Sequence, residues 1–68
     1  MSEARAFKAM LAAESRMFAA NDEFENAQAA VNEADTTANN DRLERARINL
    51  EIAKAGVDGT YAAWKAAK

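Results

Sequence analysis

The sequence predicts an all-α protein, an antiparallel two-helix hairpin that associates into a four-helix bundle. The 68 residues include no Pro and only two Gly, and they are rich in residues such as Ala, Glu and Lys that lose little rotamer freedom in a helix. Apolar residues recur every seven positions in both halves of the chain. A polar segment of Thr, Asn and Asp separates the halves and favours a turn. We therefore expect one domain over residues 1–68.

The first helix is predicted over about residues 2–36, with Ser2 as its N-cap. Large residues recur at intervals of seven, and an alanine follows each of them by three positions. This is a heptad seam with large side chains at a and alanine at d, a combination that lets two helix axes approach closely. The a positions are Met10, Met17, Phe24 and Val31, and the d positions are Ala13, Ala20, Ala27 and Ala34.

The turn is predicted at about residues 37–40, within the segment from Asp35 to Asp41. Thr and Asn side chains form local hydrogen bonds that compete with a helix, and Asn tolerates a left-handed cap. Either Asp41 or Asn40 is expected to cap the second helix, with Glu44 completing an approximate capping box.

The second helix is predicted over about residues 41–67 and repeats the seam. Pairing each a position with an opposing d position at a constant residue-number sum of 77 centres the turn between Ala38 and Asn39. This centre agrees with the composition of the polar segment. The a positions are Leu43, Leu50, Val57 and Trp64, and the d positions are Ala46, Ala53, Thr60 and Ala67.

The two glycines, Gly56 and Gly59, lie inside the second helix. The seam keeps its phase across both of them, which favours a continuous helix. The alternative is a break, with Asp58 or Thr60 capping a short last helix. Because an interior glycine costs about 1 kcal/mol relative to alanine, a continuous helix requires a compensating contact.

Apolar residues outside the seam predict a further interface. A chain this short buries little surface by itself, and without Cys or His it lacks disulfides and the usual transition-metal ligands. Self-association is the remaining source of stability, so we expect a homodimer, with a tetramer as the alternative. The residues predicted at an interface with a second copy or with another protein are Phe7, Leu11, Phe18, Ile48, Ile52, Ala55, Gly59, Ala62 and Ala66.

The charge distribution bears on nucleic-acid binding. The net charge is -2, whereas a nucleic-acid-binding protein usually has a strongly basic face. The chain carries a charge of -4 through Thr36 and +2 after it, so the two halves attract each other. The best candidate nucleic-acid contact is the cluster Arg42, Arg45 and Arg47, since guanidinium groups bind phosphates bidentately. Its spacing around the helix favours instead a charge cluster balanced by nearby acidic residues.

The residues that catalysis commonly requires are missing. Without His or Cys the chain lacks the common general base and the thiol nucleophile. The acidic residues lack the Glu-x-x-His pairs of di-iron bundles, so no metal site and no cofactor are predicted. The start of the chain lacks the basic and apolar regions of a signal peptide, and no apolar stretch is long enough to cross a membrane. The expected location is the cytoplasm.

These observations predict a small self-associating helical module, not an enzyme, that binds, scaffolds or inhibits another protein. The alternative is an RNA- or DNA-binding regulator of the helical-hairpin dimer type. The two classes differ in salt dependence, because phosphate binding weakens steeply as salt rises.

Overall fold

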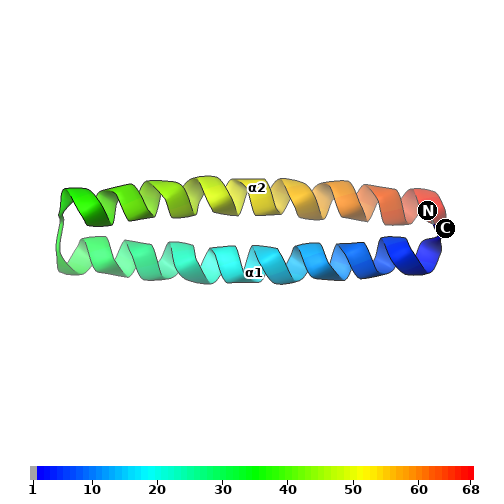
Figure 1. The fold of residues 1–68 in the computed structure, drawn as a ribbon, viewed down its shortest axis with the longest axis horizontal. Helices are drawn as coiled ribbons and strands as arrows, with labels where there is room; N and C mark the ends of the chain where they lie inside the picture. The colour runs from blue at the N-terminus through cyan, green and yellow to red at the C-terminus, as the bar shows by residue number, and fades with distance from the viewer. Residues whose placement is uncertain (1) are drawn as a thin grey trace.

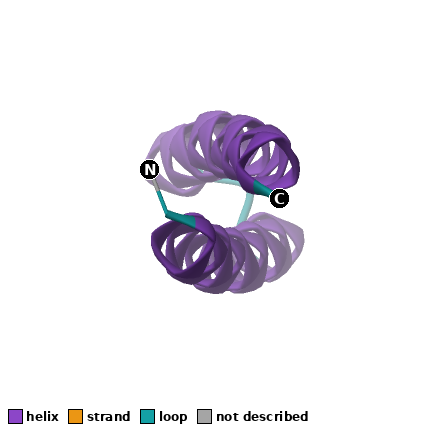
Figure 2. Cartoon of the chain, turned by 90° about the vertical axis from the view of Figure 1, so that its right-hand side faces the viewer, coloured by secondary structure: helices purple, strands orange, loops and turns teal. Residues whose placement is uncertain are grey.

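The computed structural model describes residues 2–68, which form two antiparallel α-helices of equal length, α1 (Glu3–Glu33) and α2 (Thr37–Ala67) (Figure 1). The hairpin is a narrow rod with extents of 48 × 13 × 11 Å. Viewed along the rod, the two helices lie side by side (Figure 2). The predicted all-α class and the two-helix hairpin are confirmed. Position 1 of the predicted domain lies outside the described residues.

The start of α1 follows the predicted capping. Ser2 has an extended backbone, and its hydroxyl accepts a hydrogen bond from the backbone N–H of Arg5 at 3.3 Å. This bond satisfies one of the four N–H groups that a helix leaves unpaired at its first turn. Ser2 is therefore the N-cap, as the sequence predicts.

The turn lies earlier than the sequence predicts. The helices are joined by residues 34–36, and residues 37–40 form the first turn of α2. The expected caps Asp41 and Asn40 are wrong, because Thr36 is the N-cap and its hydroxyl accepts a hydrogen bond from the N–H of Asn39 at 3.1 Å. The amide of Asn39 also reaches back to α1 and donates to the carbonyl oxygens of Ala30 at 3.2 Å and Ala34 at 2.8 Å. A side chain of α2 thus binds two carbonyl oxygens at the end of α1, which holds the helix ends together across a connection of residues 34–36.

The earlier turn changes the register between the helices. The turn is centred on Asp35. Residues that lie opposite each other on α1 and α2 therefore have numbers that add to about 70, and not to 77. The rings of Phe7 and Trp64 accordingly lie 5.9 Å apart between centroids. The difference is one heptad, so the partners of each residue change while the face that it presents to the other helix stays the same.

The contact between the helices is narrow and rich in alanine. The buried residues are Ala6, Met10, Ala13, Ala27, Ala46 and Leu50, with Ala27 fully buried at 0% exposure. Alanine at the contact allows close approach of the backbones, and larger residues such as Phe24 and Trp64 are half-buried beside it. Ala34, predicted at the seam, is exposed because it belongs to the turn.

The second helix is continuous through both glycines, as predicted. Neither glycine has a positive φ, and a Cβ built at Gly56 or Gly59 would meet nothing within 4 Å. The hydroxyl of Thr60 donates to the carbonyl oxygens of Gly56 at 2.9 Å and Val57 at 3.0 Å. Thr60 therefore bonds within the helix and caps no break. The contact that would compensate for the glycines is not found inside the hairpin.

Candidate interaction surfaces

Among the residues that the structure describes, six large apolar side chains are exposed on the surface of the hairpin. Two of them, Phe18 at 60% and Ile52 at 65% exposure, lose little of their surface to the hairpin core. Five of the six belong to the predicted interface, and the sixth is Tyr61. The full set is Phe7, Leu11, Phe18, Ile48, Ile52 and Tyr61.

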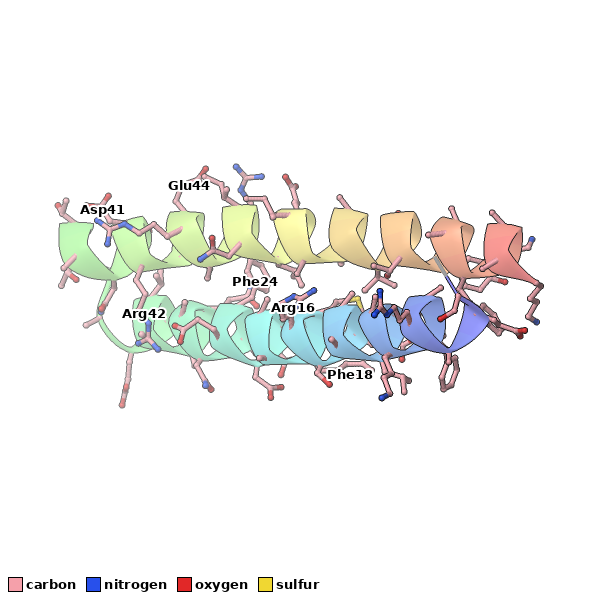
Figure 3. All side chains as sticks on the ribbon, turned by 45° about the vertical axis from the view of Figure 1, so that its right-hand side comes forward. Arg16, Phe18, Phe24, Asp41, Arg42 and Glu44 are labelled. Atoms are coloured by element: carbon pink, nitrogen blue, oxygen red, sulfur yellow. The ribbon has the colours of Figure 1, made fainter. Side chains whose placement is uncertain are left out.

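Three of these residues follow one another along α1. Phe7, Leu11 and Phe18 are spaced by four and seven positions, which places them on one side of a helix. We call this set the α1 flank. Figure 3 shows Phe18 on the side of α1 remote from α2, whereas Phe24 lies between the helices. Phe18 therefore points away from α2, whereas Phe7, at the other end of the α1 flank, lies against Trp64 of α2.

An aromatic cluster closes one end of the α1 flank. Trp64 lies 5.9 Å from both Phe7 and Tyr61 between ring centroids, with the rings tilted at 50° and 48°. Tilted aromatic pairs at this distance are attractive beyond their buried area. The Nζ of Lys68 lies 3.8 Å from the centre of the Trp64 ring, and that of Lys65 lies 5.6 Å from the Tyr61 ring. Trp64 therefore anchors the ends of the two helices to each other.

The predicted interface residues of α2 form a second surface. Ile48, Ile52, Ala55, Gly59, Ala62 and Ala66 are all exposed and recur at spacings of four and three. We call this set the α2 face. Ile52 also lines an open groove of about 380 Å³ together with Arg16, Asn49, Gly56 and neighbouring alanines. The α2 face is thus flatter than the α1 flank, because most of its side chains are small.

The structure does not bring these two surfaces together. Each residue turns the helix by about 100°. When this rotation is counted from the buried positions, the residues of the α1 flank fall on one side of the hairpin. The groove that contains Ile52 and Arg16 lies on the other side, since Arg16 precedes Phe18 by two positions. The predicted interface is therefore two separate surfaces, and one flat contact cannot cover both.

Two of the three predicted arginine contacts are already bound to carboxylates. The Nε of Arg42 donates to Glu23 Oε1 at 2.6 Å across the two helices. Arg47 binds Glu44 at 2.6 Å and Glu51 at 3.1 Å along α2. The expectation that acidic residues balance the cluster agrees with these pairs. The bridge to Glu23 was not predicted, because it depends on the register between the helices.

The charged pairs shift the ionisation of their members. The hydrogen bond from Arg42 lowers the pKa of Glu23 below its ordinary value, and Glu23 raises the pKa of Arg42. The hydrogen bond from Arg47 likewise lowers the pKa of Glu44. All three guanidinium groups lie at the surface, and Arg45 and Arg42 line a shallow hollow with Glu23 and Asp41. The hollow therefore contains both signs of charge and is not a uniformly basic site.

Within residues 2–68, no three His, Cys, Asp or Glu side chains gather closely enough to hold a metal ion. Neither α1 nor α2 contains an apolar stretch of the length and hydropathy that crossing a bilayer requires.

Comparison with known proteins adds no relative. No protein-family model, characterised protein or solved structure matches the chain. The surfaces described above therefore carry the functional argument.

Proposed function

We propose that the chain is a small self-associating helical module that binds, scaffolds or inhibits another protein. The observation that carries this proposal is the imbalance between buried and exposed apolar side chains. Among residues 2–68, Met10 and Leu50 are large and buried and six more large apolar side chains are half-buried, whereas another six are at least 42% exposed. Burial of a large apolar side chain stabilises by about 1.5 to 3 kcal/mol, so covering the exposed six would add stabilisation that a single hairpin lacks.

A closed homodimer is the simplest assembly that uses this surface. Two hairpins that pack side by side form a four-helix bundle, in which each copy contributes the same patch to a twofold interface. The regular alternation of large residues and alanines in each hairpin is typical of a heptad seam. In the proposed bundle this seam is the inner layer of each hairpin, and one of the two exposed apolar surfaces lies between the copies.

Binding of another protein follows from the two separate surfaces. A twofold dimer formed through one of them leaves the other exposed on each copy. An exposed row of apolar side chains at helical spacing fits the apolar face of a second helix. The module would therefore present one surface to itself and one to a partner. This division supports a binding or scaffolding role better than a purely structural one.

Matched variants test the proposal. Phe18→Asp places a charge in the α1 flank, and Ala12→Asp places the same charge on an exposed residue about 120° away around α1. If the α1 flank forms the dimer, Phe18→Asp reduces the mass measured by sedimentation equilibrium while helicity by circular dichroism stays unchanged, and Ala12→Asp retains the dimer. Equal masses for both variants and the unmodified chain would remove the α1 flank from self-association.

Partner binding is tested on the second surface. Chains carrying Ile52→Lys or Lys54→Ile are used as baits beside the unmodified chain in a pull-down from the native host. A protein that is retained by the unmodified chain and by the Lys54 variant, and lost with the Ile52 variant, supports binding through the α2 face. Retention by all three baits would show that the α2 face is not the binding surface.

The nucleic-acid alternative has less support. Arg42 and Arg47 would have to exchange their carboxylate partners for phosphates, and the nearby Glu23 and Glu44 would repel the backbone. No mobility shift with RNA or DNA is expected at low salt. A shift that weakens steeply as salt rises would favour this alternative over the protein-binding module.

A further inference from the structure

Charge is segregated along the rod. The midpoints of the two helices are Phe18 and Ile52, and they divide the hairpin into an open half (residues 3–17 and 53–68) and a turn half (residues 19–51). The turn half contains eight acidic and three basic residues, a net charge of -5, whereas the open half contains three acidic and six basic residues, a net charge of +3. The hairpin therefore has an acidic end and a basic end.

The segregation is strongest on α1 itself. Its second half contains four acidic residues and no basic one, and its first half carries a net charge of +1. Within one hairpin the helix dipoles of α1 and α2 point in opposite directions and largely cancel. The side-chain charges are thus the main electrostatic asymmetry of the rod.

The most exposed apolar side chains lie at the middle of the rod. Phe18 and Ile52, at 60% and 65% exposure, occupy the two helix midpoints. A twofold axis that crosses the α1 flank at Phe18 brings this residue against its own copy. The centre of an interface is where a large buried side chain contributes most, because it is best shielded from water.

The size of the rod requires that two copies overlap along their full length. A side of the rod, 48 by 13 Å, projects roughly 620 Å², somewhat below the ~800 Å² per partner of a standard stable interface. Half-length overlap would halve that area and fall well short. Full overlap leaves only two orientations, with the turns at the same end or at opposite ends.

We propose that the partner on the α1 flank is a second copy in the antiparallel orientation, with its turn half against the open half of the first. This inference rests on the proposed self-association. The antiparallel orientation places the turn half of each copy, with a charge of -5, against the open half of the other, with a charge of +3. The parallel orientation instead places the two turn halves together and the two open halves together. The antiparallel arrangement also brings Lys8 of one copy within about one helical turn of Glu25 of the other, where the two side chains form an ion pair.

Distances between labels distinguish the two orientations. The chain contains no Cys, so Ala4→Cys, Ser15→Cys and Asn32→Cys each give one nitroxide label per chain. Ala4 and Asn32 are exposed, lie fourteen positions on either side of Phe18 and share one side of α1. At 1.5 Å per residue the antiparallel dimer separates two Ala4 labels by about 42 Å along the rod, and two Ser15 labels by about 9 Å.

A mixed sample supplies the matched control. When chains labelled at Ala4 are mixed with chains labelled at Asn32, the antiparallel dimer brings the two labels side by side. In the parallel dimer these two distances are exchanged: the two Ala4 labels lie side by side, and the Ala4 and Asn32 labels of the mixed pair lie about 42 Å apart along the rod. Electron–electron double resonance measures the long separations, and dipolar broadening of the continuous-wave spectrum detects the short ones.

The outcomes separate this inference from the proposed function. Long Ala4, short Ser15 and short mixed distances support the antiparallel dimer. A dimeric mass with short Ala4 distances, or with long distances for Ser15, overturns the orientation and leaves self-association intact. A monomeric mass with no distance between chains overturns both. Raising the salt until the Debye length is ~3 Å should weaken the antiparallel dimer, and a dimer that strengthens would contradict the charge argument.

Discussion

Substitution of Gly59 by alanine is expected to stabilise the hairpin. Gly59 lies inside α2 with an ordinary helical backbone, and a Cβ at this position would meet nothing within 4 Å. The added methyl group therefore causes no clash and reduces the conformational freedom of the unfolded chain. Replacement of glycine by alanine within a helix stabilises by about 1 kcal/mol. The same reasoning applies to Gly56, which also has open space around it.

The effect is large enough to measure by thermal denaturation. For a domain of this size, 1 kcal/mol raises the melting temperature by about 4 to 8 °C. Circular dichroism at 222 nm is recorded for the unmodified chain, for Gly56→Ala, for Gly59→Ala and for the double variant, at equal chain concentration. The two increases should add within error, because a Cβ at either position meets nothing within 4 Å in the hairpin and the two substitutions share no partner.

A decrease in melting temperature for Gly59→Ala would refute this reasoning. It would mean that the backbone of another chain occupies the space beside Gly59 in the folded state. In that case the α2 face, and not the α1 flank, would be the surface of self-association. If the melting temperature rises for Gly59→Ala and falls for Gly56→Ala, such a contact lies beside Gly56 and not beside Gly59.

Three further predictions concern the hairpin itself. Ala27→Leu should destabilise by about 1 to 3 kcal/mol, because Ala27 is fully buried between the helices; urea denaturation measures the loss. Asn39→Ala should destabilise by about 0.5 to 1.5 kcal/mol, because it removes the donor to the carbonyl oxygens of Ala30 at 3.2 Å and Ala34 at 2.8 Å, whereas Asn39→Asp, which cannot donate, should not restore the loss. Because folding lowers the pKa of Glu23 below its ordinary value of 4.5, the charged carboxylate stabilises the folded state at pH values above 4.5. This contribution is lost as the pH falls through the lowered pKa. The melting temperature of Glu23→Gln should therefore fall less than that of the unmodified chain between pH 6 and pH 3, and an equal fall would refute the role of the bridge to Arg42.

The fold is largely predictable from the sequence, but its register is not. The seven-residue spacing predicts which face of each helix meets the other, and Met10 and Leu50, two residues of that spacing, are buried. A shift of one heptad preserves every a-to-d pairing, so the spacing alone cannot choose between residue sums of 77 and 70. The choice depends on the hydrogen bonds of Thr36 and Asn39, which are local details that composition does not specify.

The candidate surfaces were predicted by residue but not by arrangement. The spacing of Phe7, Leu11 and Phe18 defines a side of α1, and that of Ile48 and Ile52 defines a side of α2. Whether the two sides coincide depends on how the helices are placed against each other. The same dependence explains why the bridge between Glu23 and Arg42 was missed, since its partners are nineteen residues apart in sequence.

The central claim is that one hairpin leaves apolar surface for a second copy, and the mass of the unmodified chain in solution tests it most directly. Sedimentation equilibrium over a range of concentrations should give a species of 14.8 kDa, twice the 7.4 kDa of a single chain. A folded, helical species that stays at 7.4 kDa at every concentration would contradict the account.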